Sequence, residues 1–264
     1  MTPGRAEWTR PALFWVDPVP AAGVVTLDGP EGRHAADVRR VQPGEVILLG
    51  DGAGTRARAE VTAVARGSVT AEIVETRTDP PSGRRLVLAQ ALAKGDRGEL
   101  AVETATEAGI DAVIPWRAER CVTRWDDGPR GAKQLGRWRS TVAEAAKQAR
   151  RAWIPEVTEP LTTNQLAGRV RSTTCLLLEA TAEVSMADVA LGEEGEIVLL
   201  VGPEGGVTDA ETSRLVEAGA TPVRLGPAVL RTSTAAAVAL GALGVRVGRW
   251  DTERSGAGPG RWDA

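Results

Sequence analysis

The residues with the clearest chemical potential lie in two Gly-Pro segments. The first, Leu199–Glu211, reads LLVGPEGGVTDAE: an apolar run leads into three glycines, a proline and the carboxylate of Glu204. The carboxyl end of a parallel strand is the usual edge for a ligand crevice. Glycine lets a flat ligand approach the backbone, whereas Pro203 removes an amide donor that a phosphate-binding loop would use. The segment predicts either a pocket for a flat ligand or only a tight turn.

The second segment, Leu225–Ala235, reads LGPAVLRTSTA and again joins an expected strand to an expected helix through Gly-Pro. Its hydroxyl cluster, Thr232 to Thr234, is expected to cap that helix. Arg231 precedes the helix, where the positive end of the helix dipole disfavours a cation. Because such conflicts are expected at functional sites, Arg231 is a candidate for binding a ligand or substrate. The alternative is an exposed arginine paired with a nearby carboxylate.

Composition narrows the class of protein. The chain has 264 residues, 42% of them hydrophobic, and a formal net charge of -3, so any surface for nucleic acid must be local. Two cysteines without a CxxC spacing and a single histidine argue against a zinc site and a His-dependent triad, and no metal is expected. No apolar run of about 18 residues and no signal peptide is apparent, so we expect a cytoplasmic protein without a membrane segment.

The first part of the chain is expected to be a small β-barrel or sandwich. Strands are expected over 45–49, 56–64 and 69–74, with Gly-rich turns between them. A helical turn is expected over 33–41, ended by Pro43 and Gly44. Pro and Gly make residues 78–83 the best linker candidate.

After residue 83 strands alternate with helices. We expect strands at 86–92, 112–116, 175–178, 197–201 and 222–225, and helices at 99–108, 133–151, 208–219 and 232–247. This alternation predicts an α/β domain with a largely parallel sheet. Thr208 and Glu211 form a predicted capping box. The tail from Asp251 has little to bury and is expected to be disordered.

These segments resemble the RsmE family of SPOUT-class RNA methyltransferases. The resemblance rests on LLVGPEGG and LG…LRTSTA, with looser matches at 118–122 (AERCV), at 144–155 (EAAKQARRAWIP) and at His34 to Glu45, and it extends from about Arg10 to Val247. The chain departs from the family pattern at Val207, where a large residue is usual, at Ser233, where a glutamate is common, and at 94–99 and 107–109.

The resemblance implies the architecture and the reaction. It implies an α/β protein with a PUA-like β-barrel for RNA binding (1–78), a SPOUT methyltransferase domain with a C-terminal trefoil knot (79–249) and a disordered tail (250–264). It also implies a homodimer that uses S-adenosylmethionine to methylate N3 of a uridine in 16S ribosomal RNA of the small subunit. The alternatives are a non-catalytic RNA-binding or ribosome-assembly factor, and a SPOUT enzyme acting on another RNA site.

The site residues follow from the same resemblance. Arg231 and Glu204 are the predicted catalytic residues, with Glu204 either orienting the site or accepting a proton. The predicted cofactor-binding residues are Leu178, Glu179, Val201, Gly202, Glu204, Gly205, Leu225, Gly226, Leu230, Thr232 and Ala235. The predicted RNA-binding residues are Arg10, Arg33, Arg39, Arg120, Arg150 and Arg151. His34 is either a phosphate contact or a buried or turn-capping histidine. Trp138 and Trp153, in or beside a basic segment, either stack on bases or belong to the core.

Overall fold

The computed structural model describes residues 5–192 and 195–250, and the chain divides into two compact units. The first unit comprises Met1–Gly83 and Val142–Pro155, and the second comprises Arg84–Thr141 and Glu156–Ala264. The tail expected to be disordered, 250–264, lies outside the described residues except for its first residue. Within these described ranges, no helix combines the length and apolar character that a membrane span requires.

The first unit is built on a five-stranded sheet with the strand order β1-β3-β4-β5-β2. Its elements are η1 (Arg5–Trp8), β1 (Leu13–Trp15), β2 (Gly23–Leu27), α1 (Gly29–Arg33), η2 (His34–Arg39), β3 (Val46–Gly50), β4 (Thr55–Ala65) and β5 (Ser68–Thr78). Strand β1 runs parallel to β3, and the other pairs are antiparallel. The three predicted strands correspond to β3, β4 and β5. Phe14, Leu27 and Ile47 belong to the core of this unit.

The helical turn expected over 33–41 forms part of a longer helical segment. Helix α1 begins near Pro30 and continues into η2, a π-helix that ends at Arg40 in the left-handed conformation, with φ of 55°. The segment lies close to the sheet because Gly32 has no side chain: a Cβ there would lie 2.4 Å from the carbonyl oxygen of Gly67. This packing fixes the position of His34 and Arg39.

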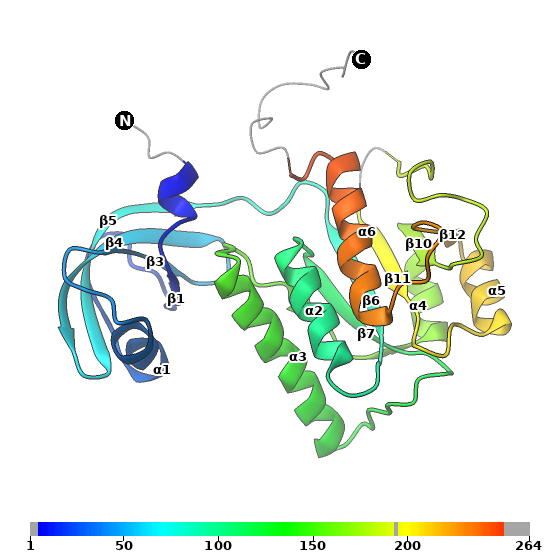
Figure 1. Ribbon diagram of the computed structural model, residues 1–264, viewed down its shortest axis with the longest axis horizontal. Coiled ribbons are helices and arrows are strands. Elements are labelled where there is room, and N and C mark those ends of the chain that lie inside the picture. The colour runs from blue at the N-terminus through cyan, green and yellow to red at the C-terminus, as the bar shows by residue number, and fades with distance from the viewer. Residues whose placement is uncertain (1–4, 193–194, 251–264) are drawn as a thin grey trace, which may run out of the picture. The chain divides into compact units, whose positions relative to one another are not determined.

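The second unit is built on a seven-stranded sheet that is parallel throughout (Figure 1). Six strands follow the order β12-β10-β11-β6-β7-β8, and β9 pairs with β7. The elements are β6 (Leu86–Ala91), α2 (Arg97–Glu107), β7 (Ala112–Arg117), α3 (Pro129–Gln148), β8 (Glu156–Val157), β9 (Leu161–Thr162), α4 (Thr163–Val170), β10 (Thr174–Leu178), β11 (Ile197–Val201), α5 (Asp209–Glu217), β12 (Thr221–Val223) and α6 (Thr232–Arg246).

The predicted α/β domain with a parallel sheet is confirmed. Every residue of β6 and β11 is buried, as expected where helices cover both faces of a sheet. Helices α2 and α6 lie side by side over one face (Figure 1). The predicted capping box of Thr208 and Glu211 begins α5. Helix α4 escaped the sequence prediction, although Thr162 and Gln165 form a second capping box at its start. Helix α3 begins in the second unit and ends in the first.

Arg249 fastens the end of the described chain to the start of this sheet. Its guanidinium lies 2.5 Å from the carboxylate of Asp111, and both side chains are largely buried, at 13% and 15% exposed. It also donates a hydrogen bond of 3.1 Å to the carbonyl oxygen of Arg84. The end of the described part of the chain, at Arg249, is thereby held beside the start of β6.

We predict that Arg249→Met destabilises the protein by about 1–3 kcal/mol, because it removes a largely buried ion pair with Asp111 and the hydrogen bond to the Arg84 carbonyl oxygen. The matched control is Arg85→Met, which removes a more exposed arginine (44% exposed) paired with Glu156 (62% exposed) and, at 3.6 Å, with Glu196; since Glu196 keeps its pair with Arg169, the loss should be less than about 1 kcal/mol. Urea denaturation followed by circular dichroism compares the two. Equal losses would contradict this account of the chain end.

Candidate functional site

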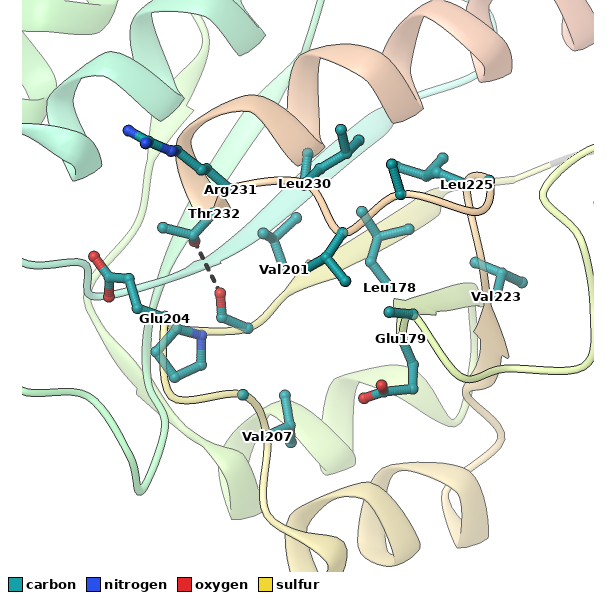
Figure 2. A pocket seen from close by; sticks show the side chains of 18 of the residues that line it. Leu178, Glu179, Val201, Glu204, Val207, Val223, Leu225, Leu230, Arg231 and Thr232 are labelled. Atoms are coloured by element: carbon teal, nitrogen blue, oxygen red, sulfur yellow. Dashed lines mark hydrogen bonds between the residues drawn. The ribbon is translucent and has the colours of Figure 1, made fainter.

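A cavity of about 470 Å³ opens at the carboxyl ends of β10, β11 and β12. Leu178, Val201, Leu225 and Leu230 give it an apolar lining, and the Gly-Pro segments supply much of the wall (Figure 2). The predicted cofactor-binding residues that line it are Leu178, Glu179, Val201, Gly202, Glu204, Leu225, Gly226, Leu230, Thr232 and Ala235. Pockets that bind small molecules combine this size with mostly apolar walls.

One hydroxyl joins the two Gly-Pro segments. The side chain of Thr232 donates a hydrogen bond of 2.8 Å to the carbonyl oxygen of Gly202 (Figure 2). It also accepts one of 2.9 Å from the amide nitrogen of Gln90, which is fully buried in β6. The expectation that this hydroxyl cluster caps α6 was wrong: Arg231 occupies the N-cap position without a side-chain cap, because the Thr232 hydroxyl is engaged across the sheet.

The contact of Gln90 with Thr232 was not predicted from the sequence. A single amide side chain inside the apolar run LVLAQAL was the signal, since a buried polar group in a strand needs a partner.

Two glycines of the first segment lie close to other side chains of the protein. A Cβ at Gly202 would lie 2.7 Å from Cγ2 of Val207. A Cβ at Gly205 would lie 3.3 Å from Cβ of Arg120, whose guanidinium donates a hydrogen bond of 3.1 Å to the Gly205 carbonyl oxygen. Gly205 is accordingly absent from the cavity lining. Gly206 adopts φ of 73°, which a side chain disfavours.

Glu204 is held as a carboxylate at one end of the cavity. It accepts hydrogen bonds from the backbone N–H of Lys94 (3.2 Å) and from the guanidinium of Arg97 (3.1 Å). Burial raises the pKa of the carboxyl group, but these bonds, one from its own backbone N–H and the charge of Arg97 together hold the pKa below its ordinary value. A carboxylate with a lowered pKa is a weak proton acceptor near neutral pH.

Arg97 is a cavity residue that the sequence analysis did not predict. It lies in the segment 94–99 that departs from the family pattern, and no local signal linked it to Glu204, which lies 107 residues away in sequence.

Arg231 lines the cavity with its guanidinium pointing away from the central hollow, and Glu179 lies across the hollow from Glu204 (Figure 2). Within the described residues Arg231 makes no ion pair, so the alternative of a carboxylate-paired arginine finds no support there. The carboxylate of Glu179 accepts a hydrogen bond of 3.2 Å from the hydroxyl of Thr181. The cavity therefore has an arginine at one end whose charge is available to a ligand.

Glu211, at the start of α5, ties three segments together behind the cavity. It accepts hydrogen bonds from the backbone N–H of Glu119 (2.9 Å), the hydroxyl of Thr163, and the N–H and hydroxyl of Thr208 (3.3 and 3.2 Å). Burial raises the pKa of this carboxyl group, but the hydrogen bonds outweigh it and lower the pKa below its ordinary value. The segment that carries Arg120 is thus fixed beside Gly205.

Comparison with known proteins identifies the family. The model of an RNA methyltransferase domain matches residues 80–244, and that of an RNA methyltransferase PUA domain matches residues 27–74. Over 249 residues the chain is 49% identical to ribosomal RNA small subunit methyltransferase E of Mycobacterium bovis, covering 92% of this chain and 95% of that one. The chain belongs to the ribosomal RNA small subunit methyltransferase E (RsmE) family.

Other RsmE proteins extend the likeness. The Bacillus subtilis relative is 29% identical over 231 residues, covering 84% of this chain and 90% of that one. A crystal structure of the Neisseria gonorrhoeae protein, bound to S-adenosyl methionine, superposes with a TM-score of 0.78 at 30% identity and covers 89% of this chain and 98% of that one. The resemblance inferred from the two Gly-Pro segments is therefore confirmed.

The arginines predicted to bind RNA are divided between the units. Arg10, Arg33, Arg39, Arg150 and Arg151 lie in the first unit, and Arg120 lies in the second, against Gly205. Among the described residues no group of three or more His, Cys, Asp or Glu side chains is placed to hold a metal, and the predicted absence of a metal stays a prediction.

The aromatic residues beside the basic segment are packed into the protein. Trp138 is 2% exposed and meets Trp125 edge to face, so the core interpretation holds for Trp138. The indole N–H of Trp153 donates a hydrogen bond of 3.0 Å to the carbonyl oxygen of Asp79. Stacking of an RNA base on Trp138 would require this packing to open.

We predict that Glu211→Gln lowers stability at pH 7, because the four groups that contact this carboxylate are all donors and an amide offers only one acceptor oxygen. Since the pKa of Glu211 is lowered by folding, its stabilisation is present above the unfolded-state pKa of about 4.3 and is lost as the pH falls through the folded-state value. The difference between wild type and variant should therefore shrink from pH 7 to pH 3 in urea unfolding.

The control is Glu217→Gln, at the exposed end of the same helix, which should give a small and nearly pH-independent difference. A Glu211→Gln effect that stays constant over the same pH range would contradict the role of the ionised carboxylate.

Proposed function

We propose that this protein transfers the methyl group of S-adenosylmethionine to N3 of a uridine in 16S ribosomal RNA. The supporting observation is a cavity of about 470 Å³ formed by both Gly-Pro segments in a chain of the RsmE family. Its apolar walls suit an adenosine, and its backbone groups suit the edge of an adenine. The sulfur-bound methyl group of the bound donor is already activated, so the protein needs to orient the reactants and exclude water.

The acceptor nitrogen, N3 of the uracil, has to be activated, whereas the methyl donor is already activated. A neutral uracil N3 carries a proton and is a poor nucleophile, so the N3–H bond must break before the nitrogen lone pair attacks the methyl carbon and the carbon–sulfur bond breaks. A cation beside the uracil carbonyl oxygens would stabilise the imide anion. Arg231 is the proposed source of that charge, since it borders the cavity and makes no ion pair within the described residues.

Glu204 is assigned the orienting role rather than that of the base. Its lowered pKa makes it a weak proton acceptor, and its bonds to Lys94 N–H and Arg97 hold it in one position. In that position its negative charge also lies near the site where a positively charged methyl donor would bind. The N3 proton is then released to water as the target base enters.

The target base has to leave its stack to reach a cavity of this kind. We assign residues 1–78 to RNA binding and 79–249 to methyl transfer. Arg10, Arg33, Arg39, Arg150 and Arg151 would contact the RNA backbone, and Arg120, which is bonded to the Gly205 carbonyl oxygen, would contact the RNA near the target.

A trefoil knot and a homodimer belong to the same proposal. The segment between β10 and β11 bonds across the chain after β12, where Met186 N–H donates to Arg224 O (2.9 Å), and it also receives hydrogen bonds of 2.7 Å from Arg246 of α6. Such contacts are expected of a loop through which the C-terminal segment passes. Exposed valines at the cavity rim and on α6, Val229 and Val238, offer apolar surface for a second copy.

We predict that Arg231→Ala lowers methyl transfer to 16S rRNA by about 100- to 1,000-fold, the range seen when one charge-stabilising donor is removed. The affinity for S-adenosylmethionine, measured by calorimetry, should change by less than about threefold, because the arginine acts on the acceptor. Arg171→Ala, which removes an exposed arginine at the end of α4, is the control and should leave both values unchanged.

Mass spectrometry of the nucleosides released from the product identifies the methylated atom. N3-methyluridine is the expected product. Normal turnover by Arg231→Ala would remove this residue from the mechanism, and a different modified nucleoside would refute the assignment of N3.

A further inference from the structure

A second, smaller cavity lies wholly within the first unit. It has a volume of about 50 Å³ and lies between β1, η2 and the segment that follows α3. Ala12, Leu13, Phe14, His34, Arg39, Lys147, Gln148 and Arg150 line it. A space of this size exceeds what one water molecule needs, and its lining is dominated by cationic and hydrogen-bonding groups.

Within the described residues, Arg39 and Arg150 are not paired with a carboxylate. The guanidinium of Arg150 donates to the carbonyl oxygens of Pro11 (2.7 Å) and Arg10 (3.1 Å), neither of which carries a formal charge. Arg39 is exposed, and no ion pair of either arginine is found in the described part of the chain. Both guanidiniums therefore present an uncompensated charge to the cavity.

Lys147 contributes less positive charge to the cavity than the two arginines, because it is paired with two carboxylates. Its ammonium group is buried and lies 2.8 Å from Glu31 and 3.2 Å from Glu144. The side chain of Glu144 is 60% exposed, so water screens its charge. With two guanidiniums and one ammonium against two carboxylates, the surroundings of the cavity remain positive even with His34 neutral.

The backbone beside the cavity has two further features. Arg150 has φ of 53°, in the left-handed region that favours glycine. Strand β1 is an edge strand whose Trp15 N–H donates to Glu31 (3.3 Å) on its outer side. Because N–H groups alternate along a strand, the Leu13 N–H points to that same side, where Leu13 borders the cavity.

His34 is a further hydrogen-bonding residue that lines the cavity. It belongs to the π-helix η2, an arrangement frequent at functional sites, and its ring meets Phe14 edge to face with centroids 5.8 Å apart. This contact orients the imidazole, which offers an N–H donor in either tautomer.

We propose that this cavity binds a phosphate group of the RNA backbone, held by Arg39, Arg150 and His34. The inference rests on the proposed function only for the identity of the ligand as RNA. An anchored phosphate would fix the register of the RNA on the first unit without reading its sequence.

His34 is the only histidine in the chain, so its imidazole signals in a nuclear magnetic resonance spectrum need no assignment by mutagenesis. With the full-length protein, inorganic phosphate should shift these signals saturably at constant ionic strength, and chloride should not. Arg39→Gln should weaken that response. Arg66→Gln, an exposed arginine in the β4–β5 turn of the same unit but outside the cavity, should leave it intact.

The RNA measurement uses a 16S rRNA transcript and the dependence of its binding constant on salt concentration. Loss of one phosphate contact in Arg39→Gln should lower the slope of log K against log salt by about 1, and Arg66→Gln should leave it unchanged. Unfolding curves verify that both variants stay folded.

The proposal is overturned if the wild type, Arg39→Gln and Arg66→Gln give the same salt slope, or if both variants lower the slope equally. In either case the cavity contributes no more to RNA binding than any exposed arginine does. A phosphate response at His34 without a change of slope would make this a site for free phosphate and refute RNA as its ligand. Methyl transfer by the wild type is assayed separately. If the wild type transfers the methyl group normally and Arg39→Gln leaves the salt slope unchanged, only the phosphate site is refuted. If Arg39→Gln lowers the slope and the wild type transfers no methyl group, only the proposed enzymatic function is refuted.

Discussion

The cavity depends on one hydroxyl group. The Gly-Pro segments follow different strands and are not adjacent in sequence, yet Thr232 joins them by donating to the Gly202 carbonyl oxygen and accepting from Gln90 in β6. This hydroxyl is the direct link between the two segments. A threonine at the first position of α6 therefore serves the tertiary structure rather than the helix end, and Arg231 is left at the N-cap position without a side-chain cap.

Two carboxylates of the site are kept ionised by donors and serve to hold other groups in place. Glu204 connects the first Gly-Pro segment to Lys94 and Arg97, and Glu211 connects α5 to Thr163 and the segment after β7. The cavity wall is thus braced from both sides by charged acceptors whose partners are mostly backbone or hydroxyl donors. Such bonds are stronger than those between neutral groups, which suits a site that must not rearrange when a charged donor molecule binds.

Sequence patterns predicted five of the seven strands of the second unit and the capping box at Thr208, because short motifs at strand ends fix local structure. Ten of the eleven cofactor-binding residues that the family resemblance implied line the cavity. They could not predict contacts between distant segments. Arg97 meets Glu204 across 107 residues, and Gln90 meets Thr232 across 142. Both glycines were assigned to a ligand; Gly202 lines the cavity, whereas Gly205 does not and instead lies against Arg120, 3.3 Å from a Cβ placed there. Close approach within the chain leaves no mark that distinguishes it from close approach of a ligand.

A protein with a net charge of -3 that acts on RNA must keep selected arginines free of carboxylates. Anchoring a guanidinium on carbonyl oxygens does so: it restricts the side chain without cancelling its charge, whereas the pairing of Arg56 with Asp79 cancels it. Arg120 and Arg150 are anchored in this way. The anchor alone does not mark a site of contact with RNA, because Arg246 uses the same bonds to fasten the segment between β10 and β11. In the proposal made above the difference is location. Arg150 borders the small cavity of the first unit, whereas Arg246 donates from both terminal nitrogens to the carbonyl oxygens of Met186 and Val189.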